Sequence, residues 1–281
     1  MQRKFIPAFF GIVAFAGFGW LYQTTVHVPP SGQPGFSVVV ESPDGDSGSA
    51  PGAQSVSDSL LAWGSNLSST QAIQVLNNSA YAVLYSNTMK NPLAVRYSLS
   101  WQNASDAPMK RPKVPFQEDE RTSARVNAND YTRTGYDRGH MAPSFAIGKF
   151  FGRDAQIETF LMSNISPQTH LMNDGVWNSI ERMEADDFAK RFGVVDVVCG
   201  PVFEPGAPAF PSGVFIPSGH FKVIRRPDGQ AIAFFVPQNP TMSQPEACLT
   251  SIAAIEQATG LIIFPGDVTN DEKERRRTKI W

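Results

Sequence analysis

A short polar run, Asp137-Arg138-Gly139-His140, carries side chains well suited to catalysis in this 281-residue chain. A neutral imidazole titrates near neutral pH and can take a proton from water, and a guanidinium offers a rigid fork of donors to phosphate oxygens. Gly139 has no Cβ, so the backbone can turn sharply or approach a ligand closely there. The run predicts a general base, His140, beside a phosphate-binding group, Arg138.

A second polar run follows and begins at Asn173. Apolar residues after it recur with the period of an amphipathic helix, at Val176, Trp177, Ile180, Met183 and Phe188. At about 100° per residue, Asn173 and Glu181 lie about 80° apart around that helix, so both can face one cleft. Hard divalent cations prefer oxygen ligands and keep several waters, so an amide carbonyl and a nearby acid suffice for a minimal Mg²⁺ site. Asn is also a favoured helix N-cap, which is the rival interpretation of Asn173.

These runs resemble motifs of the DNA/RNA non-specific endonuclease family, the endonuclease G-like ββα-metal nucleases with a DRGH motif. The similar segments are DRGH at 137–140, SNISPQ at 163–168 and NDGVWNSIE at 173–181, with further similarity at 116–140 and 197–204. The resemblance covers most of the chain from about residue 80 onward. Several ordered motifs at compatible spacing make it specific, whereas DRGH alone would be weak.

The resemblance implies a role for five of these residues. His140 matches the general base that activates water, and Asn173 matches the one protein ligand of the Mg²⁺, for which Mn²⁺ is a second candidate. Glu181 matches the acid that holds the water ligands of the metal. Arg138 matches an arginine that contacts phosphate, and Asn164 matches an asparagine near the base that we count among the catalytic residues.

The family also places a basic residue shortly before an aromatic segment, which begins here at Phe116. Arg111 and Lys113 both precede it, so either can bind substrate together with Arg138. The sequence leaves the choice between them open.

The expected reaction is Mg²⁺-dependent hydrolysis of DNA and RNA phosphodiester bonds, leaving 5′-phosphate ends. Contacts to phosphate carry little base information, so weak sequence selectivity is expected. One alternative is a catalytically silent module on the same fold that binds nucleic acid or protein. Another is a zinc hydrolase built on His140, His170 and His220, although their spacings match no compact zinc pattern. The family resemblance also implies a homodimer as the candidate assembly.

The composition limits these functions. Hydrophobic residues make up 42% of the chain and charged residues 18%, which is ordinary for a globular protein. The net charge is −2, so the whole molecule has no basic field that would attract nucleic acid. This argues against a DNA-packaging role and leaves polyanion binding to a local patch.

The N-terminal part differs from the rest of the chain. Arg3 and Lys4 precede an uncharged apolar run over 5–22, so residues 1–24 are expected to be a signal peptide or transmembrane anchor. Residues 25–65 are rich in Pro, Gly, Ser and acids and predict a flexible linker, interrupted by GFSVVVES as a short strand. The nuclease domain is expected over 66–281. The expected location is periplasmic or extracellular, either released or anchored to the membrane, and the alternative is mitochondrial.

The remaining patterns predict an α+β fold, a mainly antiparallel sheet flanked by helices with a ββα-metal nuclease site. Strands are expected at 79–86, 94–101, 194–199, 214–216, 220–225 and 231–236, and a helix at 246–259. Cys199 and Cys248 are either two buried thiols or one disulfide, and the sequence leaves this open.

Overall fold

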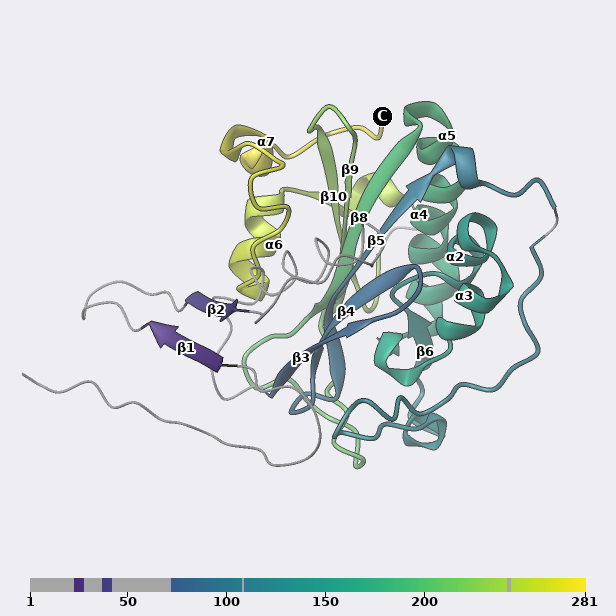
Figure 1. Cartoon of the computed structure of the whole chain (residues 1–281), viewed down its shortest axis with the longest axis vertical. Coiled ribbons are helices and arrows are strands. Elements are labelled where there is room, and N and C mark those ends of the chain that lie inside the picture. The colour runs from purple at the N-terminus through teal and green to yellow at the C-terminus, as the bar shows by residue number, and fades with distance from the viewer. Residues whose placement is uncertain (1–22, 28–36, 42–71, 108, 242–243) are drawn as a thin grey trace, which may run out of the picture.

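A computed structural model describes residues 23–27, 37–41, 72–107, 109–241 and 244–281 (Figure 1). Its central element is a seven-stranded antiparallel sheet in the order β11-β10-β9-β8-β5-β4-β3. The strands are β3 (Ile73–Asn77), β4 (Tyr81–Ser86), β5 (Asn91–Ser100), β8 (Val194–Val202), β9 (Gly219–Arg225), β10 (Ala231–Pro237) and β11 (Leu249–Thr250). The expected α+β class with a mainly antiparallel sheet is confirmed.

Helices cover both faces of this sheet, because its strands are apolar on both sides (Figure 1). Val197 and Ile224 pack with Trp177 on one face, whereas Val198 packs with Ile252 on the other. The larger layer contains α2 (Ser144–Phe151), α3 (Arg153–Glu158), η4 (Met172–Trp177), α4 (Asn178–Arg182), η5 (Met183–Phe188) and α5 (Ala189–Phe192). The smaller layer contains α6 (Ile252–Thr259) and α7 (Asn270–Glu274). Short helical turns are η1 (Trp101–Asn103), η2 (Ala128–Tyr131), η3 (Met162–Asn164) and η6 (Pro245–Cys248).

A two-stranded sheet beside the larger helical layer carries the DRGH run. Its strands, β6 (Asp137–His140) and β7 (Ile165–Gln168), are antiparallel, with His140 opposite Ile165. A Cβ on Gly139 would lie 2.1 Å from the Oε1 atom of Gln168, so any larger residue here would displace the Gln168 side chain. The helical run over 172–192 follows β7, and the two strands with this run form the expected ββα unit.

Two predicted elements differ from the structure. The strand expected at 214–216 was wrong: only Phe215 forms an isolated bridge, to Ala209, because Val214 packs in a small apolar cluster instead of a ladder. The helix expected at 246–259 begins only at α6, where the Ser251 hydroxyl accepts a hydrogen bond from Ala254 N, and the preceding residues form η6 and β11. The hairpin expected from 79–86 and 94–101 is confirmed as β4 and β5.

Two further strands, β1 (Gln23–His27) and β2 (Ser37–Glu41), pair antiparallel within the segment expected to be leader and linker. The short strand expected in GFSVVVES is therefore confirmed. The rest of the linker and the apolar run over 5–22 lie outside the described residues. Among the helices that the structure describes, none has the length and apolar character needed to cross a membrane. Cys199 and Cys248 are both buried and both free thiols.

Candidate active site

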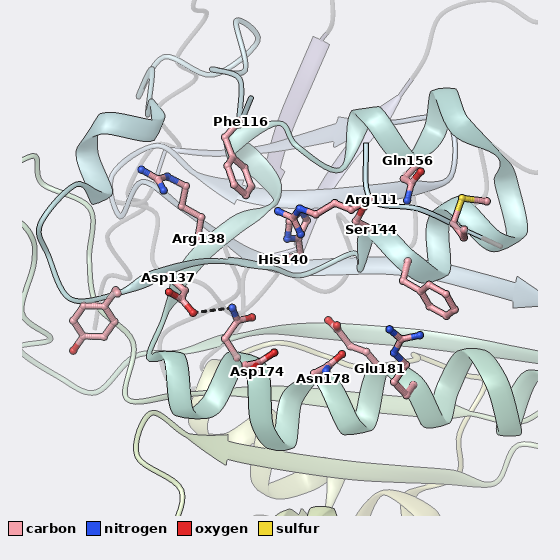
Figure 2. A pocket seen from close by; sticks show the side chains of 15 residues that line it. Arg111, Phe116, Asp137, Arg138, His140, Ser144, Gln156, Asp174, Asn178 and Glu181 are labelled. Carbon is pink, nitrogen blue, oxygen red and sulfur yellow. Dashed lines mark hydrogen bonds between the residues drawn. The ribbon is translucent and has the colours of Figure 1, made fainter. Parts of the chain in front are cut away.

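A cavity of about 540 Å³ opens between β6 and the helical run over 172–192 (Figure 2). It is lined by Met109, Arg111, Phe116, Tyr136, Asp137, Arg138, His140, Ser144, Phe145, Gln156, Asn173, Asp174, Asn178, Glu181 and Arg182. Its wall therefore contains arginines, a histidine, carboxylates and amides. These are groups that bind phosphate, move protons and hold cations.

The alternation of side chains along β6 explains one wall. Residues two apart on a strand share a face, so Arg138 and His140 both point toward the cavity. Gly139 points to the other face, where Gln168 covers it. Asn173 and Glu181 line the opposite wall, about two turns apart on the helical run, so both side chains face one cavity as their spacing predicted.

His140 presents a ring nitrogen that makes no hydrogen bond to the described residues. Its Nε2 is buried and has no hydrogen-bond partner among the described residues. The rings of Phe116 and Phe160 lie 5.4 Å and 5.2 Å from the imidazole, centroid to centroid. Burial, assisted by the nearby positive charge of Arg111, lowers the pKa of His140 to about 3. The imidazole is therefore neutral at physiological pH.

Asn173 is held by Asp137, at the start of the DRGH run. The Nδ2 atom of Asn173 donates a hydrogen bond to Asp137 Oδ2 at 3.0 Å, and His170 Nδ1 lies 2.9 Å from the same oxygen. No hydrogen bond within the described part of the chain uses Asn173 Oδ1, so this oxygen is available to a ligand. The N-cap interpretation of Asn173 was wrong, because the helical run begins at Met172 and its cap position, Leu171, makes no side-chain hydrogen bond.

Glu181 places a carboxyl group at the inner end of the cavity. Its Oε1 atom is buried, lacks a hydrogen-bond partner among the described residues, and lies 4.0 Å from Lys222 Nζ. Burial raises the pKa of Glu181 to about 8, although the charge of Lys222 opposes this. The Oε1 atom therefore makes no direct hydrogen bond to the described residues, although Lys222 lies just beyond hydrogen-bonding distance.

Lys222 belongs to a buried polar network beneath Glu181. Its Nζ donates to Glu184 Oε2 at 3.0 Å and to the Tyr97 hydroxyl at 3.0 Å, and that hydroxyl donates to Glu184 Oε1 at 2.6 Å. Lys222 and Glu184 are fully buried. Burial alone would lower the pKa of Lys222, but the carboxylates of Glu184 and Glu181 outweigh it and raise that pKa. The amine therefore stays protonated beneath the site.

Two arginines lie beside His140, one held by a backbone carbonyl and the other by an aromatic ring. Arg138 donates from Nε and Nη2 to the Ala128 carbonyl, at 3.1 Å and 2.5 Å, which leaves Nη1 outside these bonds. The Arg111 guanidinium lies 4.8 Å from the centroid of the Phe160 ring and lines the cavity. Lys113 is exposed and does not line it. Between the two basic candidates for substrate binding, the geometry favours Arg111.

Asn164 lies behind the base and outside the cavity wall. Its Oδ1 accepts from Ala142 N at 2.8 Å, and its Nδ2 donates to the carbonyls of Ala142 and Thr159, both at 3.0 Å. These bonds use the whole amide and fix the backbone that follows His140. The geometry thus indicates a positioning residue where the motif predicted a catalytic one.

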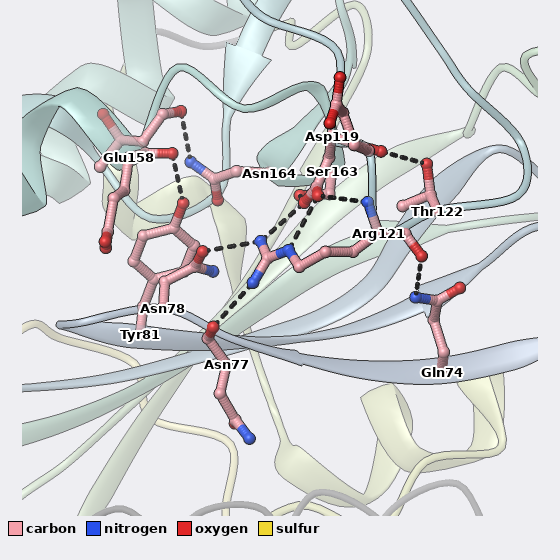
Figure 3. A network of polar contacts seen from close by, with 12 residues as sticks. Gln74, Asn77, Asn78, Tyr81, Asp119, Arg121, Thr122, Glu158, Ser163 and Asn164 are labelled. Atoms are coloured by element: carbon pink, nitrogen blue, oxygen red, sulfur yellow. Dashed lines mark hydrogen bonds and ion pairs between the residues drawn. The ribbon is translucent and has the colours of Figure 1, made fainter. Parts of the chain in front are cut away.

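A second polar network holds the segment that contains Asn164 (Figure 3). Asp119, which is buried, accepts from Arg121 Nη2 at 2.7 Å and from the Ser163 hydroxyl at 2.5 Å. Burial alone would raise the pKa of the Asp119 carboxyl, but the hydrogen bonds from Arg121 and Ser163 hold it below its usual value. Arg121 also donates to the Asn77 carbonyl at 2.8 Å, so it braces the fold and does not contribute to the cavity.

The chain is similar to known proteins. A family model described as DNA/RNA non-specific endonuclease matches residues 63–270. The chain belongs to this family. The resemblance read from the DRGH run is therefore confirmed.

Relatives of this endonuclease family agree with the assignment. The chain is 32% identical to "Nuclease EXOG, mitochondrial" of Xenopus laevis, over 77% of the chain and 64% of that protein. It is 29% identical to human "Endonuclease G, mitochondrial", over 55% of the chain and 58% of that protein. The match thus spans less than two thirds of the length of either relative. Among solved structures, an EndoG/EndoGI complex matches with a TM-score of 0.62 and 25% identity, over 71% of this chain and 88% of that chain.

Three residues in or beneath the candidate site were not predicted from the sequence: Asp137, Glu184 and Lys222. Asp137 stands in the DRGH run itself, and its contact with Asn173 joins segments 36 positions apart in the sequence. Glu184 follows Glu181 by three positions, which places both acids on one helix face and was the available signal. Lys222 had a weaker signal, as a charged residue within an otherwise apolar strand.

Because His220 is buried, we expect the free energy of unfolding of this fold to fall in acid. Its Nε2 lies 3.0 Å from the Ser166 hydroxyl, and burial lowers its pKa to about 3. Since the unfolded pKa is about 6.5, the unfolded state binds the proton first, and stability is lost as pH falls from about 6.5 toward 3. The free energy of unfolding should fall by up to about 1.4 kcal/mol per pH unit for this group. Urea unfolding at several pH values should show a shallower dependence for His220→Asn; parallel curves would contradict the prediction.

Proposed function

We propose that the chain is a Mg²⁺-dependent, largely sequence-nonspecific endonuclease that hydrolyses DNA and RNA phosphodiester bonds and leaves 5′-phosphate ends. The observation that carries this proposal is the convergence of His140, Asn173 and Glu181 on one cavity that Arg111 and Arg138 also line. A neutral base, oxygen donors and phosphate-binding cations are the components that phosphodiester hydrolysis requires.

The residues present fit a hard divalent cation. Asn173 Oδ1 and Glu181 Oε1 are oxygens without hydrogen-bond partners in the described part of the chain, and Asp137 holds the Asn173 amide in place. Mg²⁺ keeps most of its waters and needs few protein ligands, and Mn²⁺ accepts the same donors. Asn173 would ligate the cation and Glu181 would orient its waters. When bound, the cation would neutralise charge that develops on the phosphoryl group.

The zinc alternative has no support in the geometry. Within the residues that the structure describes, no group of three or more His, Cys, Asp or Glu side chains could hold a metal ion. His140 lines the cavity, His170 is exposed at its edge beside Asp137, and His220 is buried against Ser166. The three histidines do not share a site.

The side chains divide the reaction between them. His140 Nε2 takes a proton from the attacking water, and the new P–O bond forms as the bond to the 3′ oxygen breaks. The 3′ oxygen takes up a proton from solvent and leaves as a hydroxyl, while the phosphate stays on the 5′ side. Arg138 and Arg111 bind the non-bridging phosphate oxygens and hold the phosphorus in line with the water. All these contacts are to the backbone of the substrate, so both DNA and RNA fit and base identity has little influence.

The biological setting is part of this proposal. The mitochondrial names of the two relatives match the alternative location, mitochondrial, better than export to the periplasm or outside the cell. Membrane anchoring through 5–22 and a homodimer stay predictions. Light scattering of the purified chain tests whether it forms a homodimer.

One experiment separates an enzyme from a catalytically silent binding module. Supercoiled plasmid and a single-stranded RNA are incubated with the wild-type chain across a Mg²⁺ titration, with EDTA in a parallel series. Nicking and RNA cleavage that require the cation support the proposal, and end-labelling identifies the 5′-phosphate. Binding of both nucleic acids with no cleavage at any Mg²⁺ or Mn²⁺ concentration would establish the silent module instead.

Asn173→Ala is expected to raise the Mg²⁺ concentration needed for half-maximal cleavage by about 10- to 100-fold, because the variant lacks the one protein oxygen that we assign as ligand. Plasmid nicking across a Mg²⁺ titration measures this shift. Asn178→Ala is the matched control, since Asn178 lines the same cavity and carries the same side chain. Equal shifts in both variants, or none in either, would reject Asn173 as the ligand.

A further inference from the structure

A second cavity of about 250 Å³ adjoins the first, and Met109 and Phe145 line both. The other residues around it are Trp101, Ser105, Asp106, Ala107 and Lys149. None of these residues has a part in the hydrolysis described above. The second cavity therefore extends the candidate active site toward the end of β5 and the helix α2.

Aromatic rings and cations alternate along this extension. The Arg182 guanidinium lies 4.1 Å from the centroid of the Phe145 ring, at the boundary between the cavities. Lys149 Nζ and Lys190 Nζ lie 4.8 Å and 5.7 Å from the centroid of the Trp101 ring. Rings interleaved with cations are the usual means of holding a single-stranded nucleic acid, with bases on the rings and phosphates near the cations.

Some of the cations near the second cavity are not paired with acids, so an anion can bind there. Lys149 donates to Asp186 Oδ1 at 2.7 Å, so one acid already uses part of its charge. In the described part of the chain neither Arg182 nor Lys190 forms an ion pair. Asp106 lines the second cavity, Asp186 pairs with Lys149, and Glu181 lies close enough to Arg182 for the two charges to interact. Arg182 and Lys190, which form no ion pair among the described residues, are the cations that can bind a phosphate.

We infer that the second cavity is a subsite for the nucleic-acid strand that flanks the cleaved phosphodiester, and that it takes a base out of the stack against Trp101 and Phe145. This inference rests on the proposed function and narrows its substrate class. A base in a duplex is paired and stacked, so it must be unstacked at a cost before it reaches such a cavity. Single strands therefore occupy the subsite more readily than duplexes.

The test uses oligonucleotides with one cleavable bond, all other linkages being nuclease-resistant phosphorothioates that keep their charge. The strand is extended stepwise on the 5′ side or on the 3′ side of that bond. For the wild type, kcat/KM should rise with extension on one side. Trp101→Ala should lose about 5- to 150-fold on the extended substrates, which corresponds to one stacked base, and the loss should grow with strand length.

Matched variants separate this effect from damage to the fold. Phe151→Ala removes an exposed ring from the same helical region, outside both cavities, and should leave the length dependence as in the wild type. Trp101→Phe keeps an aromatic ring, so it should retain part of the rise in kcat/KM that extension of the strand produces. Because Trp101 packs edge-on against Phe150, Lys190→Gln, an exposed position, gives a second measure that does not risk folding. Lys190→Gln should also reduce the rise in kcat/KM that extension of the strand produces.

The outcomes distinguish the subsite from the proposed function. If the wild type cleaves none of the substrates, the proposed function fails. If it cleaves them but extension on neither side raises kcat/KM, or if Trp101→Ala loses the same factor on short and long strands, the subsite is rejected while the nuclease remains. Equal affinity of the His140→Ala protein for single strands and duplexes of the same sequence would also reject it.

Discussion

His140→Ala is expected to lower kcat for cleavage of DNA and RNA by about 10²- to 10⁴-fold, the range that general base catalysis contributes. The Nε2 atom of His140 is unpartnered among the described residues and its imidazole is neutral, so its lone pair is free to take the proton of the attacking water. Alanine at this position removes the base and leaves the phosphate-binding arginines in place. Steady-state cleavage of a labelled single strand at saturating Mg²⁺ measures the effect.

His170→Ala provides the control for this prediction. His170 carries the same ring, is exposed, and contacts Asp137, which lines the same cavity. Its loss should change kcat only slightly. The circular dichroism spectrum and Tm of both variants should match the wild type closely enough to exclude unfolding. Near-normal turnover by a folded His140→Ala protein would reject His140 as the base.

Local patterns in the sequence were sufficient for much of the fold. Strand residues alternate or run apolar over β4, β5, β8, β9 and β10, so periodicity located them. The same criterion failed at 214–216, because the apolar residues there pack into a cluster without a partner strand. Apolar character predicts burial more reliably than it predicts pairing.

The residues that we propose as catalytic could be found because they lie within short motifs. Arg138 and His140 are two apart on one strand, and Asn173 and Glu181 are about two turns apart on one helical run, so their directions follow from local geometry. Residues that support them could not be found in this way. The bond from Asn173 to Asp137 depends on how separate elements pack, which no local spacing encodes.

Asn164 shows a related limit of motif matching. The motif placed it near the base, and the structure does so too, but its amide is fully used by the backbone at Ala142 and Thr159. A motif identifies a neighbourhood, whereas the hydrogen bonds indicate whether a side chain faces the substrate or holds the residue that does. The distinction matters for experiments, because substitution of a positioning residue alters folding and activity together.

Lys222→Met is expected to lower the free energy of unfolding by about 3–5 kcal/mol, the cost of leaving one member of a buried ion pair without its partner. Lys222 and Glu184 are fully buried and 3.0 Å apart, so no solvent can replace the lost interaction. Glu181, 4.0 Å from the same amine, would lose its nearest cation as well, so its pKa would rise further above its usual value. Urea unfolding at pH 7 measures the change in stability.

The double variant Lys222→Met/Glu184→Leu decides whether the pair or the volume of the side chains is responsible. Removing both charges leaves no buried ion unpaired, and buried pairs exchanged for apolar residues are often neutral or stabilising. Most of the lost stability should therefore return. The Tyr97 hydroxyl would lose both of its partners in the network, so recovery should be incomplete and Tyr97→Phe in the double variant should restore more of it. If the double variant is as unstable as Lys222→Met alone, the prediction is wrong. The stability would then come from packing around the methylene chain of Lys222 and not from the charge pair.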